Sequence, residues 1–277
     1  MYRQNKQAII TKVESGFNLP IMVTEILMML ENPEIDINRI QLKVKQDIAL
    51  SSRLLSIANS SFYGFSGEIR SMNEAFMVLG TKQVKNIILT SALVSRFLKG
   101  KKNNLDLVLL WQHSLGTAVT ASVLAELLRL DQETAFIAGM MHDIGKMVLD
   151  CCFPEDYKHV CAAVEKKECL ILDAEKTIFE LDHAAVGQHL LLGWHFPADI
   201  CEAVGGHHKP DDHVNPITDV VHLADVISRA LDIGHAGDHF VPLLNNGVIG
   251  RLKIDIDTVA DLFSQIEQES QRVIAQY

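Results

Sequence analysis

Apolar residues recur at helical spacing along most of this chain, and residues that cap helices stand where the apolar runs begin. Four such caps are Asp47, Ser71, Asp131 and Asp182. Glu74 follows Ser71 by three residues, which is the spacing of a capping box. No apolar–polar alternation extends beyond a few residues, so β-strands are not expected. The sequence therefore predicts an all-α fold.

A polar, basic stretch from Leu98 to Asn104, which includes Gly100, is typical of a linker or an exposed loop. The 277 residues fit one large domain or two small ones. We therefore expect a smaller N-terminal helical lobe over residues 1–98 and a second lobe over residues 99–233. Residues 234–277 are expected to form a loop and a last helix that pack on the second lobe.

The formal charge of −10 and the pI of about 5.6 indicate an acidic surface, which would repel a nucleic-acid backbone. Non-specific nucleic-acid binding is therefore not expected, whereas a single nucleotide bound at a metal remains compatible with the charge. The chain has no uninterrupted run of about 20 apolar residues and no signal peptide at its start, so no membrane span is expected. The odd number of cysteines without a C-x-x-C pair favours free thiols and the cytoplasm.

The strongest chemical signal is the pair His142-Asp143, within the run Gly139–Lys146 of an otherwise apolar helical stretch from Ala135 to Met147. Burial of a carboxylate without a partner is costly, so such an Asp needs a cation, hydrogen bonds or a metal. Adjacent residues on a helix diverge by about 100°, so the two could meet one metal only if other helices supply further ligands. The alternative is a hydrogen-bonded pair at a helix end.

Other apolar helical segments each contribute ionisable groups that could complete such a site: His113, His183, His207, His208 and Asp225. Each residue alone is more often structural. Imidazole and carboxylate groups together suit divalent transition metals, so the set favours a metal centre. His222 stands three residues before Asp225 and is expected on the same helical face, as its partner.

The order of His113, His142-Asp143 and Asp225 resembles the H…HD…D signature of the HD superfamily of metal-dependent phosphohydrolases. The fuller resemblance is to the HDOD family and extends from about residue 18 to residue 210, with Asp225 beyond it. It is carried by Leu54–Gly64, Ser71, Ala75, Leu79-Gly80, Trp111–Ser114, Gly139–Lys146, Asp182–Gly187, Trp194–Pro197 and His207–Pro210.

This resemblance implies an HD-type helical bundle that binds one or two divalent transition metal ions (Fe, Mn, Ni or Zn) and hydrolyses a phosphate ester or a nucleotide. One ion would be held by His113, His142, Asp143 and Asp225. The second would be held by His183, His207 and His208, with Asp143 as the bridge. Asp143 and Lys146 would be the catalytic residues, with Lys146 near the substrate phosphate; the alternative for Lys146 is a solvated lysine at a helix end.

The sequence departs from the related HD-GYP proteins after the paired histidines, where it has Lys209-Pro210-Asp211 in place of Gly-Tyr-Pro. Cyclic di-GMP is therefore not expected to be a good substrate. Two alternatives to a phosphohydrolase stay open. One is a non-catalytic signalling module that binds a partner protein or a nucleotide, and the other is a helical protein whose His/Asp pairs are hydrogen-bonded without a metal.

Overall fold

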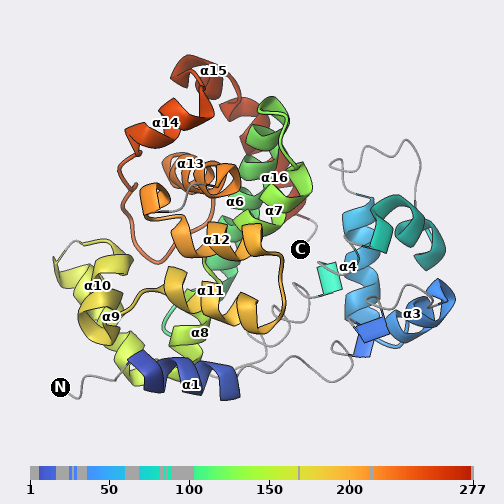
Figure 1. The fold of residues 1–277 in the computed structure, drawn as a ribbon, viewed down its shortest axis with the longest axis horizontal. Helices are drawn as coiled ribbons and strands as arrows, with labels where there is room; N and C mark the ends of the chain where they lie inside the picture. Colours follow the sequence, from blue (N-terminus) through green and yellow to red (C-terminus); the bar gives the residue numbers. More distant parts are fainter. Residues whose placement is uncertain are drawn as a thin grey trace. The chain divides into compact units, whose positions relative to one another are not determined.

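All the secondary structure in the described part of the chain is helical, which confirms the predicted all-α fold (Figure 1). The structure is a computed structural model. It describes residues 6–16, 25–26, 28–29, 36–59, 69–81, 84, 87–88, 103–167, 169–212 and 215–275. Residues 98–102 of the proposed linker Leu98–Asn104 and residues 60–64 of the family motif Leu54–Gly64 lie outside these ranges.

The chain divides into two compact units, of which the smaller is Asn18–Lys99. It contains α3 (Ile37–Val44), α4 (Ile48–Ala58) and a helix at residues 72–81. The predicted caps are present: Asp47 Oδ1 accepts a hydrogen bond from the backbone N of Leu50. Ser71 and Glu74 form a reciprocal capping box, in which the Glu74 backbone N donates to Ser71 Oγ at 3.2 Å and the Ser71 backbone N donates to Glu74 Oε2 at 3.0 Å.

The larger unit consists of Met1–Phe17 and Gly100–Ala275. Its first helix, α1 (Lys6–Gly16), packs against α8 (Ile144–Cys152) and α11 (His183–Gly193). The sequence places this helix in the lobe of residues 1–98, whereas the structure packs it with the helices that follow residue 100. Amphipathic spacing predicts a helix but does not say which partner covers its apolar face.

The core of the larger unit is built around α6 (Leu107–Leu127), which contacts α7 (Gln132–Met141), α13 (Pro216–Ala230) and α16 (Phe263–Ile274). By length and composition alone α6 could cross a membrane, yet 78% of its most apolar window is buried inside the protein. A helix at the centre of a bundle is covered by other helices on all sides, so it is apolar all round without contact with a membrane.

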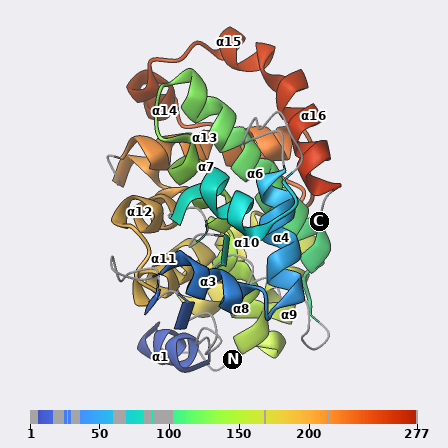
Figure 2. The same cartoon turned by 90° about the vertical axis from the view of Figure 1, so that its right-hand side faces the viewer.

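The remaining helices surround this core. They are α9 (Pro154–Lys167), α10 (Ile171–Phe179), α12 (Ala198–Gly206), the 3-10 turn η2 (Pro210–Asp212), α14 (Asn246–Leu252) and α15 (Ile256–Asp261). α14 and α15 lie at one end of the unit in both views (Figure 1, Figure 2). The sequence predicts a loop and one last helix over residues 234–277, whereas the structure has α14, α15 and α16 there, and a turn at Leu262 separates the last two.

Candidate metal centre

The pair His142-Asp143 lies at a break between two helices. The sequence predicts one helix through this stretch, but α7 ends at Met141 and α8 begins at Ile144. Asp143 has φ −99° and ψ 7°, outside helical geometry, and its side chain makes no capping bond. The break removes the divergence that a continuous helix would impose, and His142 Nε2 lies 3.3 Å from Asp143 Oδ2.

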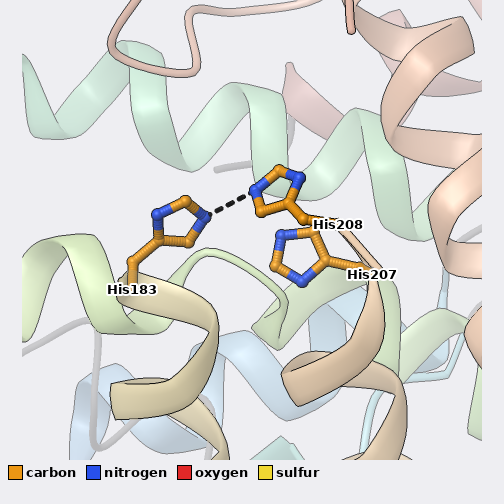
Figure 3. A group of neighbouring side chains, drawn as sticks. All are labelled: His183, His207 and His208. Atoms are coloured by element: carbon orange, nitrogen blue, oxygen red, sulfur yellow. Dashed lines mark hydrogen bonds between the residues drawn. The ribbon is translucent and has the colours of Figure 1, made fainter. Parts of the chain in front are cut away.

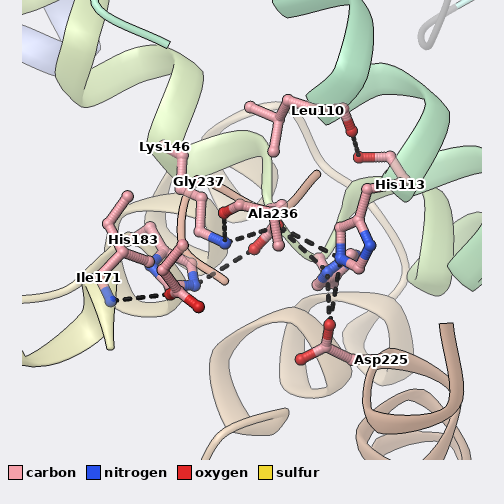
Figure 4. A network of polar contacts seen from close by, with 12 residues as sticks. Leu110, His113, Lys146, Ile171, His183, Asp225, Ala236 and Gly237 are labelled. Atoms are coloured by element: carbon pink, nitrogen blue, oxygen red, sulfur yellow. Dashed lines mark hydrogen bonds and ion pairs between the residues drawn. The ribbon is translucent and has the colours of Figure 1, made fainter. Parts of the chain in front are cut away.

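Two flanking helices bring further ligand candidates to this pair. His113 comes from α6, and its Nε2 lies 3.1 Å from Asp225 Oδ1 of α13 and 3.7 Å from Asp143 Oδ2 (Figure 4). His142 Nε2 lies 3.7 Å from the same Asp225 oxygen. All four side chains belong to residues that are at most 2% exposed. The four residues predicted for a first metal therefore converge in the interior of the larger unit.

The three remaining histidines form an adjoining group (Figure 3). His183 is the first residue of α11, and His207 and His208 follow the end of α12. Their ring nitrogens lie within 4.8 Å of one another. His183 Nε2 is 2.9 Å from His208 Nε2 and 3.3 Å from Asp143 Oδ1. Asp143 thus presents one oxygen to each group, which is the arrangement that a bridging carboxylate requires.

The ring nitrogens are fixed so that lone pairs face the centre. Nδ1 of His142 and Nδ1 of His207 lie 2.7 Å from the carbonyl oxygens of Gly139 and Val204. Because a carbonyl only accepts, each Nδ1 carries a proton and each Nε2 is left facing the centre. Burial lowers the pKa of His207 and of His208 well below the usual range, so both rings stay neutral.

Several buried atoms of the centre lack a partner. Among the residues that the structure describes, no hydrogen bond reaches His113 Nε2, His142 Nε2, His207 Nε2 or Asp143 Oδ1. Buried polar atoms are normally satisfied, so four orphaned atoms in one place need an explanation. One or two divalent cations at these atoms would satisfy them, and the imidazole and carboxylate donors suit a transition metal. The assignment of these residues as metal ligands stays a prediction.

Lys146 is fully buried, which excludes the alternative of a solvated lysine. Its Nζ donates to Asp143 Oδ2 at 2.7 Å and to the carbonyl oxygen of Ala236 at 2.8 Å (Figure 4). Burial by itself raises the pKa of Asp143, but its interactions with His142 and Lys146 outweigh it and hold that pKa well below the usual range. Asp143 is therefore a carboxylate whose Oδ2 accepts from Lys146 and also faces His113 and His142, while its Oδ1 faces His183.

The loop Gly234–Phe240 contacts two elements that carry residues of the centre, since the carbonyl oxygen of Ala236 accepts from Lys146 of α8. His235 N donates to the carbonyl oxygen of Leu109 in α6. Gly234 has φ +67°, and a Cβ there would collide with the backbone N of His113. Only glycine adopts this conformation at so close an approach without strain. The loop is therefore tied to the helix that carries His113.

Arg229 links this loop to Asp225, a role that the sequence interpretation missed. Its Nε donates to Asp225 Oδ1 at 3.0 Å and its Nη1 donates to Asp238 Oδ1 at 2.9 Å. The other oxygen of Asp238 accepts from the backbone N of Ile171, at the start of α10. The signal available in the sequence was a basic residue four positions after Asp225 on the same helix.

Glu175 of α10 was also missed. Its Oε2 accepts from His183 Nδ1 at 2.6 Å and from His183 N at 2.8 Å. Burial lowers the pKa of His183, but the neighbouring Glu175 carboxylate outweighs it and raises that pKa to about 9. His222, expected as the partner of Asp225, instead donates from Nδ1 to the carbonyl oxygen of His207 at 2.7 Å. It supports the main chain of a ligand candidate on α12.

Several known proteins are similar to this chain in sequence or in fold. The crystal structure of an HDOD domain protein with unknown function from Geobacter sulfurreducens matches with a TM-score of 0.78 and 26% identity, over 99% of both chains. An uncharacterised protein of Treponema pallidum (strain Nichols) is 24% identical over 232 residues, which is 81% of this chain and 44% of that protein. The cyclic di-GMP phosphodiesterase CdgJ of Vibrio cholerae is 28% identical over 169 residues, 57% of this chain and 38% of that protein.

This chain spans less than half the length of these two curated relatives. The HDOD domain model matches residues 17–210, which is more than half of the chain and includes six of the seven ligand candidates. Asp225 lies beyond the matched range, and the structure brings it to the other six through α13. On this match and on the fold, the chain belongs to the HDOD family.

Proposed function

We propose that this protein is a metal-dependent phosphohydrolase that acts on a phosphate ester or a nucleotide with one or two divalent transition ions, Fe, Mn, Ni or Zn. The observation that carries the proposal is the set of buried atoms on His113, His142, His207 and Asp143 that make no hydrogen bond. Hydrogen-bonded His/Asp pairs without a metal would satisfy these atoms, so the purely structural alternative fits less well.

The donor set divides naturally between two ions. His113, His142, Asp143 and Asp225 would hold the first, and His183, His207 and His208 would hold the second, with Asp143 shared. A divalent ion at such a site polarises a phosphoryl group and lowers the pKa of a water molecule, which together supply the chemistry of hydrolysis.

The protein's own residues provide orientation and charge. Lys146 holds a buried positive charge beside Asp143, where it would favour a phosphate and the negative charge that develops on it during reaction. Among the seven ligand candidates, His208 is the one that is partly exposed. A substrate phosphate would reach the centre past His208 and the exposed Lys209.

The segment after His208 argues for a small substrate. Asp211 and Asp212 are exposed there and carry negative charge. Asp211 is partly balanced, since Arg251 Nη1 donates to its Oδ1 at 2.7 Å and Asn245 Nδ2 donates to its Oδ2 at 2.8 Å. The negative charge of Asp212 would still repel a doubly charged cyclic dinucleotide. The Vibrio cholerae relative is a cyclic di-GMP phosphodiesterase, but the match covers 38% of it, and we propose that cyclic di-GMP is a poor substrate here.

The test is turnover with saturating Mn²⁺ or Fe²⁺ against cyclic di-GMP and a panel of nucleotides and phosphate monoesters. We expect slow or narrow hydrolysis that His142→Ala abolishes and that His159→Ala, at an exposed histidine of α9, leaves unchanged. Rapid cleavage of cyclic di-GMP that is lost in His142→Ala would contradict the proposed specificity.

A second candidate is a non-catalytic signalling module that binds a partner protein or a nucleotide. The burial of the centre favours this module, because a substrate has little access to it. Six of the seven ligand candidates are buried, and Lys146 donates a hydrogen bond to the carbonyl oxygen of Ala236. Failure of a fully metallated protein to cleave any member of the panel would favour this module over the hydrolase.

A further inference from the structure

The histidines of the second group differ in what holds their rings. His207 is oriented by a neutral backbone carbonyl, as is His142 in the first group. His183 is oriented by the carboxylate of Glu175, at 2.6 Å from its Nδ1. Glu175 is 0% exposed and lies on α10, a helix that supplies none of the seven ligand candidates.

Both oxygens of Glu175 are engaged. Oε2 accepts from the ring and the backbone N of His183, and Oε1 accepts from the Tyr157 hydroxyl at 2.8 Å. Burial raises the pKa of Tyr157 well above its usual value, and the charge of Glu175 raises it further, so the hydroxyl stays a donor. The same carboxylate therefore fixes the ring and the main chain of His183 at the N-terminus of α11, where a negative charge is also favoured by the helix dipole.

The geometry sets the side of the ring that faces the centre. A carboxylate accepts a hydrogen bond, so Nδ1 of His183 carries a proton and Nε2 is the nitrogen left to bind a cation. That Nε2 lies 3.3 Å from Asp143 Oδ1 and 2.9 Å from His208 Nε2. A cation shared by these three atoms would satisfy them together.

We propose that Glu175 is a positioning residue for the second metal position, the one formed by His183, His207, His208 and Asp143 Oδ1. It acts through His183, by fixing the orientation of the ring and by raising the basicity of Nε2. Carboxylate–histidine–metal arrangements of this kind tune metal affinity, and loss of the carboxylate weakens binding by about 10–100-fold. The inference rests on the proposed metal centre and deepens it.

The experiment compares Glu175→Gln with Tyr157→Phe in the full chain. Glutamine keeps the size of the side chain and removes the charge, whereas Tyr157→Phe removes one hydrogen bond to Glu175 and leaves both of its contacts with His183. Mn²⁺ is titrated into the metal-free proteins by equilibrium dialysis. Electron paramagnetic resonance then distinguishes a coupled pair of ions from an isolated ion, and circular dichroism checks the fold.

We expect two Mn²⁺ per chain in the wild type and in Tyr157→Phe. In Glu175→Gln the second ion should bind about 10–100-fold more weakly while the first is unchanged, and the signal of an isolated ion should appear at one equivalent. Wild-type affinities for both ions in Glu175→Gln would overturn the inference and leave the proposed function intact. An equal weakening of both ions, or the same weakening in Tyr157→Phe, would show a merely structural role and also overturn it. A wild type that binds no metal would instead overturn the proposed function, and this inference with it.

Discussion

At the scale of single residues, the centre is a set of buried charges that offset one another. Asp143 faces Lys146, and Asp225 faces Arg229, which in turn holds Asp238. Removal of one member of a buried ion pair leaves the other charge without compensation and costs far more than the pair itself contributes. The stability of the metal-free protein should therefore depend on these cations.

Lys146→Met tests this dependence. In the metal-free protein the change should lower the free energy of unfolding by about 3–5 kcal/mol, because Asp143 is left buried and unpaired. Metal loading should restore much of the loss, since the ion offsets the same carboxylate. Urea unfolding with and without Mn²⁺ measures both values, and Lys158→Met, at an exposed lysine of α9, is the control. A loss of equal size in the two states would contradict this account of Asp143.

The histidines predict how the stability of the metal-free protein depends on pH. Burial lowers the pKa of His113, His207 and His208, so these rings stay neutral in the folded protein and gain protons on unfolding below pH 6.5. His183, with a pKa of about 9, is protonated in the folded protein and only partly protonated in the unfolded chain at pH 6.5, so it adds a smaller slope of opposite sign that vanishes toward pH 5. The unfolded chain then binds more protons, so the free energy of unfolding should fall as pH drops from 6.5 to 5. Urea unfolding at fixed pH values checks this, and a flat or rising profile would be inconsistent with neutral buried rings.

At the scale of helices, the site depends on close approaches as well as on ligands. The break between α7 and α8 lets the side chains of His142 and Asp143 point to the same centre. The absence of a side chain at Gly145 then lets the first turn of α8 pack against the main chain of His183. A Cβ at Gly145 would collide with the His183 carbonyl group and lie 2.9 Å from its Cα. The glycine after the His-Asp pair thus sets the spacing between the two groups of ligand candidates.

Gly145→Ala should push α11 away from α8. We expect destabilisation of about 1–3 kcal/mol, as for other overpacked core sites. Affinity for the second metal should also fall, because His183 moves with α11. The matched control is Gly193→Ala at the other end of the same helix, where a Cβ would meet no atom within 4 Å. Thermal unfolding measures the stability of both variants, and metal titration measures their affinity for the second ion. Equal stability and equal affinity in the two variants would rule out this role for Gly145.

At the scale of the whole molecule, local sequence signals predicted elements better than their partners. The caps at Asp47, Ser71, Asp131 and Asp182 are each confirmed by a side-chain hydrogen bond, because capping is decided within one turn of chain. The helix break at His142 was not predicted, since the surrounding apolar residues keep helical spacing. The packing of α1 on α8 and α11 was not predicted either, because it depends on contacts between residues distant in the sequence.

The candidate site followed the same pattern. The seven ligand candidates stand out in the sequence as ionisable residues within apolar helices, and the structure brings them together. Glu175, Arg229 and Asp238 did not stand out, because a carboxylate or a guanidinium in a polar-looking stretch is ordinarily solvated. Their roles depend on burial that only the packed bundle creates, where Glu175 and Asp238 are 0% and 5% exposed.

The most direct test of the central claim is the metal content of the protein purified without a histidine tag. Elemental analysis should find one or two transition metal ions per chain, and Asp143→Ala should deplete both positions because Asp143 presents one oxygen to each group. His159→Ala should match the wild type. A wild type without a transition metal after loading with Fe²⁺, Mn²⁺, Ni²⁺ or Zn²⁺, or an Asp143→Ala variant that retains the full metal content, would contradict the claim.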